Sequence, residues 1–301
     1  MKYELAIIVP VKDEEKNIPL VIREFENKLN TIKSLQVFFV DDGSLDNSWN
    51  SIKNTTSSNN ININAIKLSK NYGKDKALYA GLTKVDANYI VFYDCDMQFD
   101  ASYIKSMYDL IQKDTSYIIQ AKKRKKDINK NSKFFYNIFN ILTGFDFNGD
   151  TYLKMFSCKI KEKILLFNES DIFIRGVFKL TGYNTKNIEV DVTKRKDGTS
   201  KYNFFKLTLL ALNAITSFSN IPLRIIPIFG SFLVIISLIV SIRLIYVRLV
   251  FGLLDGLTTF FCLFMLTSGF IIIFLGIIAE YISKIFNEVK RRPIFIIEDE
   301  K

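Results

Sequence analysis

The segment Tyr89-Ile-Val-Phe-Tyr-Asp-Cys-Asp96 decides the fold, because an apolar run in it ends abruptly in two carboxylates. A short, uninterrupted run of aromatic and aliphatic residues is typical of a strand that is buried on both faces of a sheet. Polar side chains directly after such a strand lie at the sheet edge where α/β proteins bind ligands. The segment therefore predicts a buried parallel strand with Asp94 and Asp96 at its carboxyl end.

Similar apolar runs occur on both sides of this segment, and stretches of helical length separate them. Strands that alternate with helices indicate a parallel α/β sheet whose two faces are covered by helices. The other predicted strands are residues 3–11, 37–40, 64–68 and 117–121, and the predicted helices are residues 18–32, 46–55, 74–84 and 101–113.

Four of the predicted strands end in polar segments, which a parallel arrangement brings to one edge of the sheet. Asp94 and Asp96 are two residues apart, so they can converge on one divalent metal whose remaining ligands are phosphate oxygens. The alternative for this pair is two solvated loop carboxylates. The polar segments are residues 10–14, 41–44, 69–74 and 94–98.

Two of these segments carry groups that suit a nucleotide. The adjacent carboxylates Asp41 and Asp42 can accept hydrogen bonds from a base or a ribose, with plain capping of the next helix by Ser44 as the alternative. Gly73 permits close approach of the backbone, and Lys74 places a positive charge at a helix start, where phosphates bind. The segment is not a Walker A loop, because the GxxxxGK[ST] pattern is absent.

The composition separates a soluble part of the chain from an apolar part. Of the 301 residues, 49% are hydrophobic and 24% are charged, and the apolar residues concentrate between residues 221 and 283. The chain contains no histidine, which excludes Ser–His and Cys–His nucleophile pairs and histidine-ligated metals. The three cysteines lack CxxC spacing, so neither a disulfide framework nor a zinc site is expected.

Two long apolar segments predict a transmembrane hairpin. Residues 225–242 and 256–279 carry no charged side chain, and stretches of about 20 apolar residues cross a bilayer as helices. We expect spans at residues 225–249 and 256–280, with two buried helices of a soluble protein as the alternative. Lys and Arg flank the outer ends of both spans, which places the α/β domain and both termini on the cytoplasmic side of the inner (plasma) membrane.

A basic surface accompanies the predicted spans. Lys and Arg number 41 against 31 Asp and Glu, a formal net charge of +10 that suits membrane lipids or phosphorylated substrates. No nucleic-acid-binding motif is present, so a nucleic-acid partner is not expected. The basic run 122–126 is either a solvated loop or a phosphate or membrane contact.

The predicted domain order follows from these patterns. Polar and apolar residues of the segment before the spans lie on different sides of a helix, which indicates an amphipathic helix in the membrane interface, with a core helix as the alternative. The order is an α/β domain (1–200), an interfacial helix (201–222), two spans (223–283) and a basic cytoplasmic tail (284–301).

Short motifs stand in order along nearly the whole chain. They are VPVKDEEKN (9–17), VDDGS (40–44), LSKNYGK (68–74), AGL (80–82), DCDMQ (94–98), FIRG (173–176), RKDGTSKY (195–202), SFS (217–219), PLR (222–224), EYI (280–282) and KRRP (290–293). This ordered set resembles the family 2 glycosyltransferases with a GT-A fold, a Rossmann-like nucleotide-sugar domain with a mixed, mostly parallel sheet. It is most similar to the polyprenyl-phosphate branch, which includes bactoprenol glucosyltransferases and enzymes like dolichol-phosphate mannose synthase.

The resemblance implies an inverting transfer from a nucleoside diphosphate sugar, UDP-glucose or a related UDP-hexose, to undecaprenyl or another polyprenyl phosphate on the cytoplasmic leaflet. The lipid-linked sugar would supply cell-envelope glycans such as O-antigen. The resemblance also implies that Asp94 and Asp96 are catalytic and bind Mg²⁺ or Mn²⁺. The residues expected to contact the nucleotide sugar are Pro10, Glu14, Asp41, Asp42, Lys74 and Gln98.

The acceptor side is expected to consist mainly of cations. A lipid phosphate is already anionic at neutral pH, so it needs little help from a general base, which suits a chain without histidine. Asp150 is expected to position or deprotonate the acceptor. The residues expected at the acceptor phosphate are Arg195, Ser200, Lys201 and Arg124.

Two segments depart from the family pattern. Lys12-Asp13 stands where the family has an aromatic residue and Asn before the Glu. GDTYLK (149–154) stands where the family has Gly-Asp-Phe-Arg-Leu, with Tyr152 or Lys154 in place of the Arg. We align Asp150 with the family's Asp, and a shift of two residues is the alternative.

Three other functions fit a membrane-anchored α/β domain less well. A processive polysaccharide synthase would need a Gln-x-x-Arg-Trp motif, and the only Trp of the chain is Trp49. The intact Asp94 and Asp96 pair argues against a non-catalytic scaffold that only binds nucleotide sugars. A lipid flippase would need more than two spans unless the protein oligomerises, and the sequence leaves homo-oligomer formation open.

Overall fold

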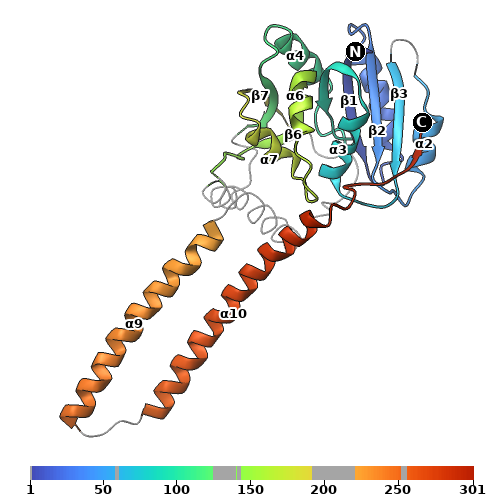
Figure 1. Cartoon of the computed structure of the whole chain (residues 1–301). Coiled ribbons are helices and arrows are strands. Elements are labelled where there is room, and N and C mark those ends of the chain that lie inside the picture. Colours follow the sequence, from blue (N-terminus) through green and yellow to red (C-terminus); the bar gives the residue numbers. More distant parts are fainter. Residues whose placement is uncertain (1, 58–60, 125–139, 141–143, 192–220, 252–255) are drawn as a thin grey trace. The chain divides into compact units, whose positions relative to one another are not determined.

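The computed structural model describes residues 2–57, 61–124, 140, 144–191, 221–251 and 256–301. The chain divides into two compact units, and Figure 1 labels most of their elements. The first unit contains residues 1–203 and 292–301, and the second contains residues 204–291. The second unit is therefore an insertion into the first, because both ends of the chain belong to the first unit.

One sheet of eight strands forms the centre of the described part of the first unit, in the order β7-β5-β6-β4-β1-β2-β3-β8. β1 pairs in parallel with β2 and β4, β2 with β3, and β5 with β7. β6 and β8 run antiparallel to their neighbours. The strands are β1 (Tyr3–Val11), β2 (Leu35–Asp41), β3 (Ile61–Leu68), β4 (Ala87–Phe92), β5 (Ile118–Lys123), β6 (Asp150–Ser157), β7 (Thr185–Val190) and β8 (Ile297–Glu300).

Helices cover both faces of this sheet, because alternate side chains of a strand point to opposite faces. One buried cluster joins the sheet to α1, α2 and α4, and the other joins the sheet to α3, α6 and α7. The helices of the first unit are α1 (Asn17–Lys28), α2 (Ser48–Asn54), α3 (Lys74–Lys84), α4 (Ser102–Ile111), α6 (Cys158–Ile164) and α7 (Ile174–Leu180).

The strands and helices predicted up to residue 121 are confirmed, whereas β6, β7 and β8 were not expected from the sequence. β6 contains Lys154, which is only 1% exposed, so a buried charge interrupts the apolar pattern of this strand. β7 and β8 are edge strands with many exposed residues, and their patterns therefore lack a long apolar run.

Close packing of α3 on the sheet depends on Gly81. A β-carbon at this position would lie 2.5 Å from Cγ2 of Ile8 and 3.1 Å from Cγ2 of Val40, both in the adjacent central strands. Glycine therefore lets α3 approach the sheet closely, and α3 begins at Lys74, at the carboxyl edge of that sheet.

The C-terminal segment returns to the sheet as strand β8, which pairs with β3. Lys301 and Ala65 exchange backbone hydrogen bonds of 2.8 and 2.9 Å. The three acidic side chains of the segment each pair with a lysine of the first unit: Glu298 with Lys67, Asp299 with Lys53 and Glu300 with Lys84. This differs from the separate basic tail expected for residues 284–301, because the acidic end of that segment complements the lysines at the sheet edge.

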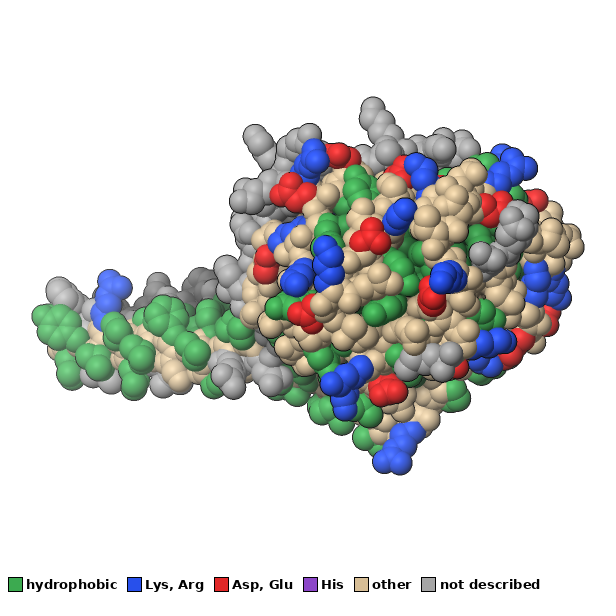
Figure 2. All heavy atoms as spheres, turned by 90° about the horizontal axis from the view of Figure 1, so that it is seen from above, with side chains coloured by type: hydrophobic (Ala, Val, Ile, Leu, Met, Phe, Trp, Pro, Cys, Tyr) green, Lys and Arg blue, Asp and Glu red, His purple; other side chains and the backbone are tan. Residues whose placement is uncertain are grey.

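Two long helices, α9 (Ile221–Phe251) and α10 (Gly256–Val289), form the described part of the second unit. They contact each other through Phe229 and Phe270, whose ring centroids are 4.8 Å apart. Hydrophobic side chains cover much of their described surface, whereas charges of both signs are scattered over the first unit (Figure 2).

One described helical segment, Thr267–Val289, is long and apolar enough to cross a membrane, and it overlaps the second expected span. A shorter apolar stretch, Ile225–Val240, lies in α9, within the first expected span. Nearly all of the expected interfacial helix, residues 201–222, lies outside the described residues.

The substitution Gly81→Ala tests the packing of α3 on the sheet. The added methyl group would overlap Ile8 and Val40, so we expect the free energy of unfolding to fall by about 1–3 kcal/mol, as in other overpacked cores. Thermal unfolding of the purified full chain measures this loss. Gly269→Ala is the control, because no described atom outside its chain neighbours and the backbone of its own helix lies within 4 Å of the added β-carbon. An equal loss of stability in the two variants would contradict the packing argument.

Candidate active site

The carboxyl ends of four parallel strands form one edge of the sheet, and the predicted polar segments lie there. The registers place Val11 of β1 beside Asp41 of β2, and Asp41 beside Lys67 of β3. Pro10 is half-buried within β1. The backbone N–H of Asp42 donates to the carbonyl of Val11 over 2.9 Å. The loop after β1 (the first loop) and the loop after β2 (the second loop) therefore start in contact.

Further hydrogen bonds join the first loop to the second. Lys12 donates from Nζ to the carbonyl oxygen of Gly43. Asp13 has a positive φ of 56°, its N–H donates to Oγ of Ser44, and its Oδ1 accepts from the N–H of Leu45 over 2.8 Å. The unusual Lys12-Asp13 pair therefore holds the neighbouring loop in place.

The second loop is in turn fixed to the loop after β3. Asp42 accepts hydrogen bonds from the backbone N–H groups of Tyr72 and Gly73, at 2.7 and 2.9 Å. Burial raises the pKa of Asp42, and these two hydrogen bonds partly oppose that rise. A β-carbon on Gly43, whose φ is +64°, would lie 2.5 Å from the carbonyl carbon of Lys70. Glycine is thus required where the two loops meet.

Asp41 and Glu14 lie beside this junction. Asp41 is fully buried; its Oδ1 accepts from the N–H of Ser44 over 2.9 Å, and its Oδ2 lacks a partner among the described atoms. The side chain of Glu14 accepts a hydrogen bond of 2.6 Å from Asn17, and its N–H donates to Oγ of Ser48. The edge therefore contains a buried carboxylate oxygen without a hydrogen-bond donor among the described atoms.

The acidic pair follows β4 in a tight turn. The hydroxyl of buried Tyr93 donates to the carbonyl of Phe99 over 2.6 Å and closes the base of this turn. Met97 has a positive φ of 54°, and the N–H of Gln98 donates to Oδ1 of Asp96 over 3.2 Å. Asp94 and Asp96 are thereby held at the end of the strand, as predicted.

Lys74 lies against Asp94. Its Nζ is 2.5 Å from Oδ1 of Asp94 and 3.9 Å from the centroid of the Tyr152 ring. The hydroxyl of Tyr152 donates to Asp75 over 3.1 Å, and the guanidinium of Arg175 lies 4.8 Å from the same ring. β6 and α7 therefore contribute side chains to the edge formed by the parallel strands.

Asp75 connects these elements. Its Oδ1 accepts the N–H of Ile174, the first residue of α7, over 2.9 Å. Burial raises the pKa of Asp75, while the charge of Arg175 and these hydrogen bonds act in the opposite direction. Burial, and then the charge of Asp75, raise the pKa of Tyr152 well above its usual value, so Tyr152 keeps its proton at neutral pH.

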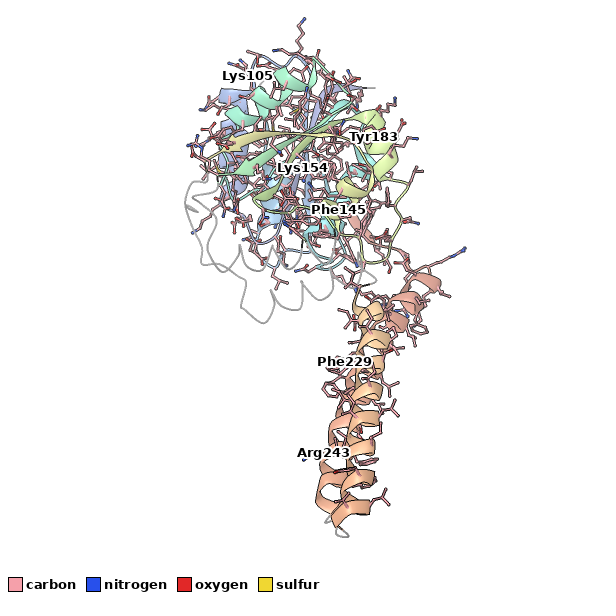
Figure 3. All side chains as sticks on the ribbon, turned by 90° about the vertical axis from the view of Figure 1, so that its left-hand side faces the viewer. Lys105, Phe145, Lys154, Tyr183, Phe229 and Arg243 are labelled. Carbon is pink, nitrogen blue, oxygen red and sulfur yellow. The ribbon has the colours of Figure 1, made fainter. Side chains whose placement is uncertain are left out.

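Asp150 occupies a buried ion pair. Its Oδ1 lies 2.7 Å from Nζ of Lys154, which also donates to Gln120 over 2.8 Å, while its Oδ2 has no partner among the described atoms. Burial lowers the pKa of Lys154 to about 8, although Asp150 partly opposes this change. Figure 3 labels Lys154 within the sheet. This geometry gives Asp150 a structural partner, and Tyr152 is the β6 residue that contacts Lys74.

Arg124 is the described member of the expected acceptor set. Its guanidinium lies 3.0 Å from Asp191 and 3.8 Å from Glu189, so acidic side chains already surround it. Arg195, Ser200 and Lys201 lie outside the described residues.

A family model described as "Glycosyl transferase family 2" matches residues 6–170. The chain belongs to glycosyl transferase family 2. It is 30% identical to a bactoprenol glucosyl transferase of Shigella phage SfV over 99% of both chains. It is 27% identical to an undecaprenyl-phosphate 4-deoxy-4-formamido-L-arabinose transferase of Proteus mirabilis, over 98% of this chain and 93% of the relative.

Solved structures show the same fold. Glucosyl-3-phosphoglycerate synthase of Mycobacterium tuberculosis, crystallised with Mn²⁺, UDP-glucose and phosphoglyceric acid, superposes with a TM-score of 0.54 at 13% identity, over 71% of this chain and 78% of the synthase. The first unit of this family 2 protein is thus a GT-A-like α/β domain with a mixed, mostly parallel sheet.

The acidic pair of this family member has the ligand chemistry of a hard divalent cation. No cluster of three or more His, Cys, Asp or Glu side chains suited to a metal occurs in the described part of the chain. Carboxylate oxygens are nevertheless the ligands that Mg²⁺ takes, and magnesium sites commonly use one or two carboxylates together with substrate phosphates and water. Asp94 and Asp96 would supply the protein part of such a set.

Three residues of this edge were not among the expected site residues: Asp75, Tyr152 and Arg175. Arg175 lies in the FIRG motif that contributes to the family resemblance, and Asp75 directly follows Lys74, so both had a signal in the sequence. Tyr152 was considered for the position of the family's Arg. In the alignment that pairs Asp150 with the family's Asp, Tyr152 stands at the position of that Arg, and its ring contacts Lys74.

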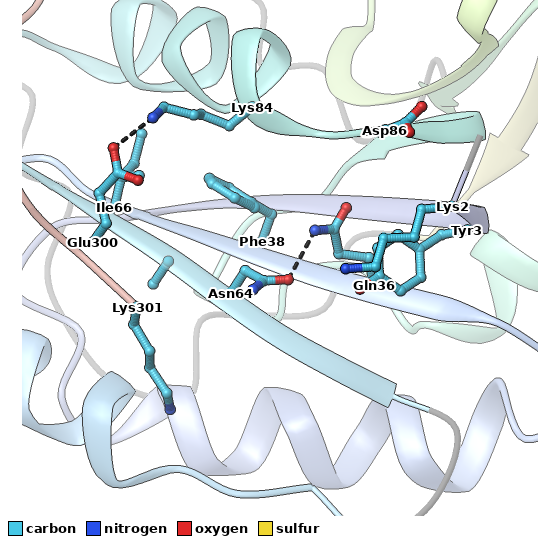
Figure 4. A pocket seen from close by; sticks show the side chains of 11 residues that line it. Lys2, Tyr3, Gln36, Phe38, Asn64, Ile66, Lys84, Asp86, Glu300 and Lys301 are labelled. Carbon is cyan, nitrogen blue, oxygen red and sulfur yellow. Dashed lines mark hydrogen bonds and ion pairs between the residues drawn. The ribbon is translucent and has the colours of Figure 1, made fainter.

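A cavity of about 250 Å³ lies elsewhere on the sheet (Figure 4). It is lined by Lys2, Gln36, Asn64 and Lys84, among other residues, and Nε2 of Gln36 donates to Asn64 over 2.9 Å. None of the four loops at the carboxyl edge contributes to this lining. The cavity is therefore separate from the candidate active site.

The substitution Lys154→Met tests whether Asp150 has a structural role. It leaves a carboxylate buried without its cation, so we expect the free energy of unfolding to fall by about 3–5 kcal/mol in denaturant unfolding of the full chain. The double variant Asp150→Leu with Lys154→Met removes both charges and should recover most of this loss. Wild-type stability of Lys154→Met would contradict the buried pair, and activity of the double variant would exclude Asp150 as a catalytic base.

Proposed function

We propose that this family 2 protein transfers a hexose from a UDP-sugar to a polyprenyl phosphate at a membrane, with inversion at the anomeric carbon. The observation that carries the proposal is the ion pair of Lys74 with Asp94 of the acidic pair at the end of β4, on the same sheet edge as the Asp41–Ser44 loop after β2, with β1 between the two strands. Two carboxylates and a cation at one strand end suit a nucleoside diphosphate that binds with a metal ion. Full-length similarity to the phage bactoprenol glucosyl transferase supports the choice of acceptor and of glucose.

The donor nucleoside would bind at the junction of the first two loops. The buried Oδ2 of Asp41 lacks a described donor, and a buried acceptor without a partner is costly. An N–H of the base or a hydroxyl of the ribose would satisfy it, with Pro10 and Glu14 beside the ligand. Asp42 would act indirectly, because both of its oxygens already hold the Tyr72–Gly73 backbone.

The diphosphate would lie over the acidic turn. Mg²⁺ or Mn²⁺ held by Asp94 and Asp96 would neutralise negative charge as the sugar–phosphate bond breaks. Lys74 would bind the same diphosphate, and the Asp94–Gln98 turn would position it. The developing charge on the leaving group is thus met by groups that are fixed before the reaction, which is how charge stabilisation is most effective.

The acceptor would attack as an anion. A phosphate monoester is mostly deprotonated at neutral pH, so its oxygen needs little base assistance. Arg195, Ser200 and Lys201 lie just before or at the start of the expected interfacial helix (201–222), and a guanidinium can bind a phosphate through two oriented hydrogen bonds. Arg124 would bind the acceptor phosphate only if its guanidinium first left the ion pair with Asp191.

A hairpin of α9 and α10 would anchor the enzyme. β7 and β8 belong to one sheet, so the chain must cross a membrane an even number of times between them. If Thr267–Val289 spans the bilayer, a second crossing has to precede it, and α9, with 31 residues, is long enough. By the positive-inside rule, the flanking cations would then favour a catalytic domain and both termini in the cytoplasm, at the inner membrane.

Transfer is tested with membranes that contain the full chain. We expect one labelled polyprenyl product from undecaprenyl phosphate and a panel of radiolabelled UDP-sugars, with UDP-glucose the preferred donor. Asp96→Asn should lower the rate at least about 100-fold, because a charge-stabilising contact is lost, while the exposed Asp109→Asn on α4 should retain it. No labelled lipid from any donor would contradict the function, and full turnover in excess EDTA would contradict the metal.

Topology is tested separately with reporter fusions after Lys301. Because β8 pairs with β3 inside the catalytic domain, a reporter that is active only in the cytoplasm should work at this position. A fusion in the connection at residues 252–255 should favour the reporter that is active outside the cytoplasm. Activity of a periplasmic reporter after Lys301 would contradict the hairpin.

A further inference from the structure

Lys74 occupies the place where a divalent cation would bind. Its Nζ lies 2.5 Å from Oδ1 of Asp94, within the acidic pair that the proposed function assigns to Mg²⁺ or Mn²⁺. Like charges a few ångströms apart repel each other, so an ammonium in contact with Oδ1 disfavours a divalent cation on the same carboxylate. The lysine and the metal therefore compete for Asp94.

The ring of Tyr152 also holds the ammonium of Lys74 beside Asp94. Its ammonium lies 3.9 Å from the centroid of the Tyr152 ring, a distance at which a cation is attracted to an aromatic face. The ring is fixed, because the hydroxyl of Tyr152 donates to Asp75 and Asp75 accepts the N–H of Ile174. Tyr152 is thus a positioning residue that supports Lys74 beside the acidic pair.

Helix electrostatics alone would not place a cation there. Lys74 is the first residue of α3, and the positive end of a helix dipole disfavours a positive side chain. The side chain is 32% exposed, so it could extend into water instead. Its contacts with Asp94 and Tyr152 offset this disfavoured placement.

We propose that Lys74 is a built-in counter-ion of the acidic pair and neutralises Asp94 in the nucleotide-free enzyme. When a divalent cation binds together with a nucleoside diphosphate, the ammonium of Lys74 leaves Asp94 and the cation binds this carboxylate instead. The proposal rests on the proposed function. The diphosphate gives the ammonium a new anionic partner, so cation and nucleotide bind cooperatively. Without nucleotide, Lys74 keeps the affinity for the cation low.

Binding of Mn²⁺ to the full chain in detergent, followed by the electron paramagnetic resonance signal of free Mn²⁺ with and without UDP, tests this exchange. Lys74→Met should bind Mn²⁺ alone about two- to fivefold more tightly than the wild type, as expected for loss of a competing, partly exposed ion pair. UDP should increase Mn²⁺ affinity less in this variant than in the wild type, because transfer of the ammonium from Asp94 to the diphosphate no longer contributes to the coupling between the two ligands. Lys74→Arg keeps the charge and should resemble the wild type.

A matched control comes from the same helix. Lys76 lies 3.9 Å from Asp171, so Lys76→Met removes one positive charge without touching the acidic pair, and it should leave Mn²⁺ affinity unchanged. Unchanged or weaker Mn²⁺ binding by Lys74→Met, or an equal gain in Lys76→Met, would overturn the counter-ion role alone. Failure of the wild type to bind Mn²⁺ even with UDP would instead overturn the metal role in the proposed function, and the counter-ion role with it.

Discussion

The carboxylate of Asp42 holds the loop that carries Lys74, and the rest of the candidate site depends on this interaction. Its two oxygens accept the N–H groups of Tyr72 and Gly73, while Gly43 lets the backbone of the second loop lie directly against the third. Three loops from three strands thereby keep fixed positions relative to one another. A transferase that stabilises a leaving diphosphate needs charged groups that are already in place, because rearranging them during the reaction would cost free energy.

The strand ends could be predicted because parallel strands bring their carboxyl ends to one edge, and short apolar runs mark those strands clearly. The position of Asp94, Lys74 and Asp41 at this edge could therefore be predicted from the local sequence. The contacts of Asp75 could not be found in this way, because its partners Tyr152 and Ile174 lie 77 and 99 positions further along the chain. β6 also escaped prediction, since the buried Lys154 looks like a surface residue until its pairing with Asp150 is known.

The C-terminal strand has a consequence for the whole chain. Its acidic side chains meet lysines on α2, β3 and α3, and its backbone extends the sheet beyond β3. Because β3 leads directly into the loop that Asp42 holds, β8 reinforces the strand from which this loop starts. The helical unit is thus inserted in the sequence between two strands, β7 and β8, of the same sheet. This arrangement suits an enzyme whose acceptor is expected to be anchored in a membrane.

A structure of the full chain with UDP and Mn²⁺ tests the central claim most directly. The account predicts the uracil or ribose within hydrogen-bond distance of Asp41, and Mn²⁺ between the diphosphate and the pair Asp94 and Asp96. It also predicts that the ammonium of Lys74 contacts a phosphate oxygen instead of Asp94. UDP bound away from the carboxyl edge, for example in the cavity beside Gln36, would contradict the assignment of this edge as the active site of a glycosyltransferase.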